Sequence, residues 1–342
     1  MTTLNKDNIH QLQLDITSYC NAFCPGCARN INGGRLNPIV PLRHMPLSVW
    51  NKIIDFVQTS NVKLLQFNGN YGDASNHPKL IEMFELLAEK INDIDIIIHT
   101  NGGARNTKFW ESLAKVLKKF SNYSHVVFSI DGLKNTNHIH RRGVDYDILM
   151  NNVKAYINAN GSAMWRMIAF EHNKQDIPKA SEYAQQLGFK VFYLNRSYAT
   201  RLEMMEYKNL PAGIVFKIPH NEFKELKEKY VFWKLHRTEA EDLDSVCPWQ
   251  KERRVQITID GSIHPCCYYA LYISNFPQMS GVNNWNEQSD PMTLAYKKYG
   301  KTFNNLNDFT LEQILDHTFW KDDLPNFWNT KDSICSYQCN VC

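Results

Sequence analysis

The sequence predicts an α/β fold organised around a parallel sheet. In its N-terminal part, six short apolar runs alternate with amphipathic stretches of helical spacing, and no hairpin signal interrupts them. Strand and helix repeated in this order favour parallel strands joined by right-handed crossovers. Six units suit either a doubly wound sheet or a partial barrel, and the pattern alone does not separate the two.

The predicted elements follow one another along this N-terminal part. The strands are expected at Leu12–Thr17, Val62–Phe67, Ile94–Thr100, His125–Ile130, Met164–Phe170 and Lys190–Leu194. The helices are expected at Ser48–Val57, Leu80–Ile91, Lys108–Phe120, Tyr146–Ile157 and Ile177–Leu187. In either parallel architecture, functional groups gather at the edge of the sheet where the strands end.

Length, composition and charge describe an ordinary soluble chain. Its 342 residues allow one large domain, or one large and one small domain. Apolar residues make up 43% and charged residues 21%, so a packed core is expected and disorder is not. Lys and Arg number 38 against 35 Asp and Glu, which gives no electrostatic basis for nucleic acid as the main partner.

The N-terminus and the cysteine usage predict a cytoplasmic location. Met1–Lys6 opens without the apolar segment of a signal peptide. The longest apolar runs, such as Ile96–Ile98, are too short to span a bilayer, so no membrane partner is expected. Nine cysteines in such a chain favour metal binding over disulfides.

Three of these cysteines form a tight loop at the end of the first predicted strand. Cys20, Cys24 and Cys27 have the spacing C-x3-C-x2-C. Thiolates are the usual ligands of iron–sulfur clusters, and a four-iron cluster normally takes four of them. Three ligands on one loop therefore leave one iron open to a small molecule. The alternative is a zinc loop completed by a fourth residue elsewhere in the chain.

The C-x3-C-x2-C loop resembles the signature of the radical S-adenosylmethionine (SAM) enzymes. The resemblance implies a partial (β/α)6 barrel, similar to a TIM barrel, with a 4Fe–4S cluster on Cys20, Cys24 and Cys27. It also implies that SAM chelates the open iron through its amino and carboxylate groups. An electron then cleaves SAM to a 5′-deoxyadenosyl radical, which abstracts hydrogen from a substrate. The electron is expected from an external donor such as flavodoxin or ferredoxin.

Three further strand exits are rich in glycine and carry an amide or a carboxylate. They are Asn68–Asp73, Asn101–Gly103 and Ser129–Gly132. These residue types are common in any turn, so a single exit has an ordinary structural explanation. Three such exits in register beside a metal loop instead indicate that the backbone approaches a polar ligand closely.

The exit of the second predicted strand resembles the Gly-Gly-Glu motif of the same family. The resemblance implies that Gly69, Asn70, Gly72 and Asp73 hold the amino group of SAM. The match has two departures: Asp73 replaces the usual glutamate, and Ala74 stands where proline often follows.

The exit of the fourth predicted strand resembles a stretch in the peptide-modifying branch of the family. Ser129–Gly132 followed by His138–Gly143 carries this resemblance, which implies contacts to the ribose and carboxylate of SAM. The expected contacts are Ser129, Asp131 and Arg142, the last chosen because a glycine follows it and because a guanidinium binds a carboxylate with two hydrogen bonds. A solvated basic turn is the alternative explanation of the arginine.

Two later strands add polar candidates on the inward face. Arg166 shares the period-two face of the fifth strand, where it either holds a ligand or forms a structural ion pair. Asn195 at the end of the sixth strand is a further candidate SAM contact. Gly26 stands where many relatives have an aromatic residue, so the ring over the adenine is expected from Phe23 or Tyr71.

The strand–helix rhythm stops near residue 201. A bridging helix is then predicted from four apolar residues at helical spacing: Phe223, Leu226, Tyr230 and Trp233. Beyond it, Arg254–Pro265 contains a strand, an Asp-Gly turn and a second strand, which predicts a hairpin with Cys247 and Cys266 at its open end.

The second cysteine set resembles the SPASM/twitch extension of radical SAM enzymes, a small α+β unit that carries auxiliary 4Fe–4S clusters. The resemblance implies one auxiliary cluster, held by Cys247, Cys266 and two of the three C-terminal cysteines, and it leaves Cys267 as a buried apolar side chain. Alternatives are a second open cluster on the C-terminal C-x3-C-x2-C and a zinc ribbon. The C-terminal cysteines are Cys335, Cys339 and Cys342.

The sequence thus predicts a radical SAM oxidoreductase in three parts. Residues 1–200 would form the barrel, 201–245 a bridge and 246–342 the auxiliary-cluster domain. The substrate is expected to be a peptide or protein side chain, or a small molecule. Three alternatives are an iron–sulfur electron-transfer or scaffold protein, a zinc-stabilised interaction module and a nucleic-acid-modifying member of the same family. No catalytic acid or base is identified from the sequence.

Overall fold

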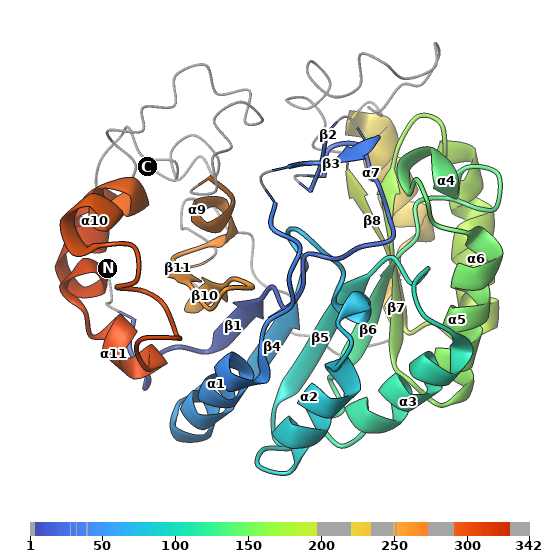
Figure 1. The fold of residues 1–342 in the computed structure, drawn as a ribbon. Helices are drawn as coiled ribbons and strands as arrows, with labels where there is room; N and C mark the ends of the chain where they lie inside the picture. Colours follow the sequence, from blue (N-terminus) through green and yellow to red (C-terminus); the bar gives the residue numbers. More distant parts are fainter. Residues whose placement is uncertain are drawn as a thin grey trace.

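A computed structural model describes residues 4–27, 29–31, 33–38, 40–196, 220–233, 249, 252–272 and 291–328. Within these ranges, nine strands form one sheet in the order β11-β10-β1-β4-β5-β6-β7-β8-β9 (Figure 1). Their bounds are β1 Gln11–Leu14, β4 Leu64–Phe67, β5 Asp95–Thr100, β6 His125–Ser129, β7 Ala163–Ala169, β8 Val191–Arg196, β9 Phe232–Trp233, β10 Arg254–Ile257 and β11 Ile263–His264. All six strands predicted for the N-terminal part are present.

The strand order identifies the architecture as a partial barrel. Strands β1, β4, β5, β6, β7 and β8 pair in parallel and follow one another in the sheet in chain order. A doubly wound sheet would reverse its order at a switch point, and this run of strands does not. The barrel stays open because β1 next pairs with β10 and β8 next pairs with β9. The predicted partial (β/α)6 barrel is confirmed.

Five helices cover the outer face of the curved sheet, and all five were predicted (Figure 1). Local signals define several of their ends: Asn106 accepts a hydrogen bond from the Phe109 backbone N–H to cap α3, Asp145 caps α5, and Gly188 with φ 89° ends α6. The bounds are α1 Leu47–Thr59, α2 Leu80–Ala88, α3 Thr107–Leu117, α5 Tyr146–Asn158 and α6 Ile177–Leu187.

The main core lies between the sheet and these helices. Alternate side chains of each strand face the helices, and Phe67, Phe128 and Trp165 are fully buried there. Phe128 contacts the rings of Trp110, at 5.3 Å between centroids, and Tyr156, at 5.7 Å. Each buried side chain of this size contributes about 1.5–3 kcal/mol through its burial, so this face drives the folding of the barrel.

The inner face of the sheet is largely polar. Gln13 is buried on β1, Gln66 and His99 follow on β4 and β5, and Arg166 lies on β7. A smaller apolar cluster, Val127 and Met164 with Val191, closes this interior at its far end. The polar part of the inner face therefore opens toward the carboxyl ends of the strands.

The C-terminal part joins the barrel directly. The predicted hairpin is present as β10 and β11, and β10 continues the barrel sheet in parallel with β1. The predicted bridging helix is α7 His220–Tyr230, and Trp233 lies beyond it in strand β9. The described helices that follow are α9 Cys267–Tyr272, α10 Pro291–Tyr299, α11 Leu311–Leu315 and α12 Leu324–Trp328.

Several short elements had no counterpart in the sequence prediction. The strands β2 Asn30–Ile31 and β3 Arg35–Leu36 form a small hairpin after the cysteine loop. The other additions are the helix α4 Asn137–His140, the 3-10 turns η1 Ala74–Asn76 and η2 Lys174–Asp176, and the π-helical turn η3 Phe319–Asp323. Among the described helices, none is long and apolar enough to cross a membrane.

Candidate active site

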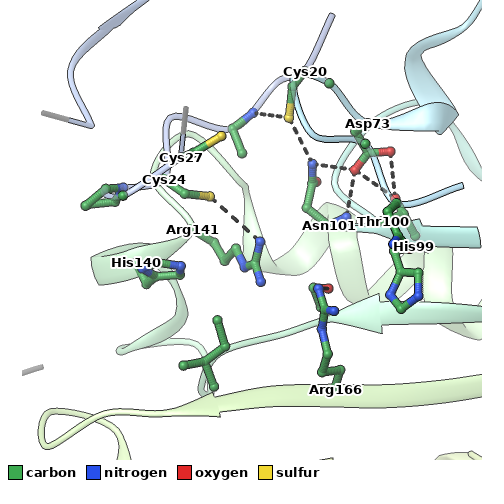
Figure 2. A pocket seen from close by; sticks show the side chains of 18 of the residues that line it. Cys20, Cys24, Cys27, Asp73, His99, Thr100, Asn101, His140, Arg141 and Arg166 are labelled. Carbon is green, nitrogen blue, oxygen red and sulfur yellow. Dashed lines mark hydrogen bonds between the residues drawn. The ribbon is translucent and has the colours of Figure 1, made fainter. Parts of the chain in front are cut away.

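The cysteine loop and the exits of β4 to β8 surround one cavity of about 370 Å³ (Figure 2). Most of the predicted site residues in the barrel lie in its lining, which brings together positions far apart in the sequence. The predicted residues in the lining are Cys20, Cys24, Cys27, Gly69, Gly72, Asp73, Ser129, Arg166 and Asn195. The lining also contains four residues from the predicted exit segments that were not named as contacts: Asn68, Asn101, His140 and Arg141. His99, Thr100, Ile168 and Phe170 line it as well.

Three thiols form one wall of this cavity, and N–H donors point at two of them. The Ala22 backbone N–H and the Asn101 side-chain amide lie 3.3 and 3.5 Å from the Cys20 sulfur. Arg141 Nη1 lies 3.8 Å from the Cys24 sulfur. Burial raises the pKa of all three thiols, that of Cys27 to about 11, and the Arg141 cation opposes the shift at Cys24.

This donor set fits a cluster held by thiolates. Three cysteine thiols face one cavity, and the amide and guanidinium donors match the hydrogen bonds that cluster ligands usually receive. In the described part of the chain, no three His, Cys, Asp or Glu side chains are arranged as a ready-made site for a metal ion.

Asp73 clamps the exit of β4 to the exit of β5. Its carboxylate is buried and accepts hydrogen bonds from the Thr100 hydroxyl at 2.9 Å, the Asn101 backbone N–H at 2.7 Å and the Asn101 amide at 2.8 Å. It also accepts hydrogen bonds from the backbone N–H and the hydroxyl of Ser75, and it thereby caps the start of η1. A carboxylate offers about four lone-pair positions, so these partners saturate it.

Two glycines let the β4 exit fold against the cysteine loop. Gly69 has φ 67°, and a Cβ there would lie 2.1 Å from the Gly72 carbonyl oxygen. A Cβ on Gly72 would lie 2.1 Å from the carbonyl oxygen of Thr17, just before the cysteine loop. The glycines predicted to allow a close approach do so here between two backbone segments.

The two asparagines of this exit point to different places. Asn70 donates from its backbone N–H and its amide to both oxygens of Asp15, at 2.8 and 2.9 Å, and it does not line the cavity. Asn68 lines the cavity, and its Oδ1 is buried with no hydrogen-bond partner among the described residues. Asn68 is therefore the residue of this exit with an unused acceptor.

At the β6 exit, the structure brings Arg141 to the cavity rather than the predicted Arg142. Arg142 donates to the Gly33 carbonyl oxygen at 3.1 Å and does not line the cavity. Asp131 is fully buried; it accepts from Arg141 Nε at 2.7 Å and from the Ile168 backbone N–H at 2.7 Å. It thereby holds the Arg141 guanidinium toward Cys24. The sequence shows both arginines side by side, and only the helix α4 before them determines which one faces inward.

Ser129, His99 and Arg166 lie on the inner face of three successive strands. Arg166 Nη2 donates to the Ser129 hydroxyl at 2.9 Å. His99 Nε2 lies 3.1 Å from the side-chain amide nitrogen of Gln66. Burial, followed by the charge of Arg166, holds the pKa of His99 well below its usual value, so this ring is neutral. Period-two alternation along β5 would have identified His99 as an inward residue.

Neither of the two rings predicted to lie over the adenine is part of the cavity lining. Phe23 and Tyr71 both lie outside the cavity lining. Phe170 at the end of β7 does line it, and its ring packs 4.8 Å from the His140 ring. Asn195 reaches the lining from the end of β8, as predicted from the strand end.

Only part of the second cysteine set lies among the described residues. Cys266 is buried in the turn between β11 and α9, and Cys267 begins α9. The other predicted ligands of the auxiliary cluster, namely Cys247, Cys335, Cys339 and Cys342, lie outside the described residues.

Comparison with known proteins gave structural matches. A search of curated proteins finds no match. The SuiB structure from Streptococcus suis, bound to precursor peptide SuiA, matches with a TM-score of 0.63 and 15% identity over 94% of this chain and 67% of that one. Native anSMEcpe with bound AdoMet matches with a TM-score of 0.58 and 15% identity over 96% of this chain and 87% of that one. The same protein with AdoMet and the Cp18Cys peptide gives 0.56, at the same identity and coverage. At these identities the likeness concerns the fold.

The family model described as the Radical SAM superfamily matches residues 14–184, which is half of the chain. That match begins at the end of β1, contains the whole cysteine loop and extends into α6. It therefore covers the wall of thiols, the Asp73 clamp and the Arg141–Asp131 pair described above. The chain belongs to the radical SAM superfamily.

Proposed function

We propose that this chain is an oxidoreductase that abstracts hydrogen from a peptide, a protein side chain or a small molecule. A cluster on Cys20, Cys24 and Cys27 would supply the electron that cleaves SAM to the 5′-deoxyadenosyl radical. The observation that supports this function best is the single cavity in which three thiols face the exits of β4, β5 and β6. An electron-transfer or scaffold protein would need no cavity of about 370 Å³ beside its cluster.

Arg141 and Asn68 would bind the carboxylate and the amino group of the methionine part of SAM. Arg141 takes the carboxylate, because Asp131 fixes its guanidinium beside the Cys24 thiol. Asn68 takes the amino group, because its Oδ1 is an acceptor without a partner in the described part of the chain. Asp73 acts one step away by fixing Asn101 beside Cys20. These roles replace the direct contacts first expected from Arg142 and Asp73.

The remaining polar contacts follow from the lining. The Ser129 hydroxyl, which already accepts a hydrogen bond from Arg166, lines the cavity and would also bind a SAM oxygen, and Asn195 offers its amide from the end of β8. Phe170 supplies the ring against which the adenine stacks.

Two of the matching structures hold a bound peptide: the precursor peptide SuiA on SuiB and the Cp18Cys peptide on anSMEcpe. A peptide or protein side chain is therefore the favoured substrate of this chain, with a small molecule as the second candidate. The electron for SAM cleavage would come from an external donor such as flavodoxin or ferredoxin, and the protein would act in the cytoplasm.

We further propose that the C-terminal part is a SPASM/twitch-like domain with one auxiliary 4Fe–4S cluster. Cys247 and Cys266 would bind it together with two of Cys335, Cys339 and Cys342. The buried position of Cys266 at the end of the β10–β11 hairpin supports this proposal. The division of the chain at about residues 200 and 246 belongs to the same proposal.

The test of the activity is SAM cleavage by the anaerobically reconstituted protein. Iron, sulfide, dithionite and SAM are added, and 5′-deoxyadenosine is measured by liquid chromatography. We expect product from the wild type, none from Cys24→Ala, and wild-type amounts from the matched control Cys267→Ala. Absence of product from the wild type, or equal product from Cys24→Ala, would contradict the proposed reaction.

Iron content tests the auxiliary cluster separately. Two four-iron clusters predict roughly eight iron atoms per chain, and loss of either cluster predicts roughly four. We expect roughly four in the triple Cys20, Cys24 and Cys27 alanine variant, and again in Cys266→Ala. If Cys266→Ala kept the wild-type iron content, the auxiliary cluster would not rest on this residue.

A further inference from the structure

Arg166 is a partly buried cation whose hydrogen-bond partners are neutral. Its guanidinium donates to the Ser129 hydroxyl at 2.9 Å and also bonds the Tyr193 hydroxyl. Its Nε is buried with no hydrogen-bond partner among the described residues. Asp131 is the carboxylate near enough to Arg166 to favour its charged form, but it already forms an ion pair with Arg141 at 2.7 Å.

An arrangement of this kind is costly unless a ligand completes it. Burial lowers the pKa of Arg166 from its usual value, and the nearby Arg141 cation lowers it further. A guanidinium nevertheless stays protonated in proteins. A buried charge without a counterion is unfavourable, so an anion entering this part of the cavity would be bound strongly.

His99 adds a second donor to the same cavity lining as Arg166. Gln11 Nε2 donates to Gln66 Oε1, which directs the Gln66 amide nitrogen at His99 Nε2. His99 therefore accepts at Nε2 and, as a neutral ring, carries its proton on Nδ1. Nδ1 is buried and has no hydrogen-bond partner in the described part of the chain.

We propose that Arg166 and His99 form a subsite for a carboxylate group of the substrate. Two donors on the inner face of β5 and β7, one cationic and one neutral, suit the two oxygens of a carboxylate. The inference rests on the proposed function, and it names the substrate class: an acidic side chain, a free peptide C-terminus or a small carboxylic acid.

The carboxylate of SAM is the other possible source of this anion, and the geometry favours the substrate. Arg141 lies at the Cys24 thiol, where the methionine end of SAM would bind. Arg166 lies across the cavity from the three cysteines (Figure 2). One arginine is thus available for each carboxylate.

The test uses the reconstituted full chain with SAM present and glutarate as the probe. Glutarate binding is measured by saturation-transfer NMR, with glutaramide at matched ionic strength as the uncharged comparison. We expect saturable binding of glutarate alone, weakened about 10- to 100-fold in Arg166→Gln and partly kept in Arg166→Lys. SAM affinity, measured by equilibrium dialysis, should stay within roughly twofold in Arg166→Gln.

Controls and opposing outcomes keep the two proposals separate. Lys63→Gln removes an exposed positive charge of the Lys63–Asp93 pair and should leave glutarate binding unchanged. If Arg166→Gln does not fold, His99→Phe carries the test, with about tenfold weaker glutarate binding expected. A large loss of SAM affinity in Arg166→Gln, equal glutarate binding by wild type and variants, or no saturable glutarate binding by the wild type would each overturn the subsite. Loss of SAM cleavage alone would count against the proposed function and leave the subsite standing.

Discussion

The two faces of the barrel sheet differ in chemistry and in burial. The inner side chains are buried near β1 and only partly buried on β4, β5 and β7. The outer face, toward the helices, is apolar, with Phe128 and Trp165 fully buried. The inner face is polar, yet Gln13 and Asp15 are only 2% and 1% exposed. Burial of apolar side chains stabilises the fold without directional partners, whereas each buried polar group needs a hydrogen bond. The inner face therefore costs stability unless its groups are paired.

Two charged groups of the inner face divide it into a paired zone around Asp15 and an unpaired zone around Arg166. Near β1 and β10, Asp15 accepts from Asn70 and from Gln256, the latter at 3.0 Å. Near β7, Arg166 keeps an unpartnered Nε among the described residues. The paired zone holds the structure together, and the unpaired zone is where a ligand would add the missing partners.

The largest expected effect on stability comes from comparing alanine substitutions at two neighbouring residues of β6, one on each face of the sheet. Phe128→Ala should lower the free energy of unfolding by about 3–5 kcal/mol, because it leaves a cavity among aromatic rings. Ser129→Ala should lower it by less than about 1 kcal/mol and weaken SAM binding about tenfold. Urea denaturation and equilibrium dialysis measure the two quantities. Equal destabilisation by both variants would remove the distinction between the faces.

Asp15 tests the paired zone through its pH dependence. Burial raises the pKa of Asp15 to about 6, against the opposing effect of the Asn70 hydrogen bonds. The folded state thus binds this proton more tightly than the unfolded state. Protonation of Asp15 therefore adds to the free energy of unfolding below about pH 4, and this contribution is lost as the pH rises through about 6. Relative to the wild type, Asp15→Asn should therefore gain roughly 3 kcal/mol between pH 4 and pH 7. Urea unfolding of both proteins across this range gives the difference, and a constant difference would contradict the expectation.

His77, next to helix α2, should show the opposite slope. Its ring accepts from the Lys79 backbone N–H at Nδ1 and bonds the Met45 carbonyl through Nε2, an arrangement that needs the neutral form. Burial lowers its pKa to about 4, so the stability is present above the usual value of 6.5 and lost as the pH falls toward 4.

The matched variants for this slope are His77→Gln and, at an exposed position, His10→Gln. In the wild type, neutral His77 should add roughly 2 kcal/mol to the loss of unfolding free energy between pH 7 and pH 5, and His77→Gln should lack this part of the loss. His10→Gln should keep the wild-type slope. A wild-type slope in His77→Gln would assign the acid sensitivity to other groups.

The smallest effect is expected on the outer surface of the helices. Lys119 and Glu85 form an ion pair with side chains that are 51% and 43% exposed. Exposed pairs of this kind contribute about 0–1 kcal/mol to stability, so Lys119→Ala should shift the urea midpoint only slightly. Salt screens the attraction between exposed charges, so this shift should vanish in about 0.5 M salt. A salt-independent loss would indicate that the Lys119 stem packs on α3.

Sequence patterns predicted the outer face well because its apolar side chains recur at regular spacing and need no specific hydrogen-bond partners. The six strands and five helices follow from apolar periodicity, and Cys20, Cys24 and Cys27 follow from their spacing alone. The β10–β11 hairpin followed from its Asp-Gly turn. What the periodicity could not supply was the pairing of β10 with β1, since hairpin signals are local and the two strands are far apart in the chain.

The inner face was predicted less well because orientation decides the role of each polar group. Arg141 and Arg142 are adjacent, and the glycine after Arg142 favoured that residue in the sequence, whereas only Arg141 lines the cavity. The Asp73 carboxylate matched a motif, yet its partners Thr100 and Asn101 saturate it. Asn68 gained its candidate role only through an acceptor left without a partner in the described structure.

The pairing of β1 with β10 also has a consequence for biosynthesis. Gln11–Leu14 pairs with Arg254–Ile257, so one edge of the barrel is completed by residues synthesised more than two hundred positions later. Until that segment leaves the ribosome, the nascent barrel exposes an unpaired strand edge, and Asp15 lacks its hydrogen bond from Gln256. Long-range pairings of this kind slow folding and leave the edge open to association with other chains. Chaperone contact during translation is accordingly expected to concentrate on β1 and to end once β10 has docked.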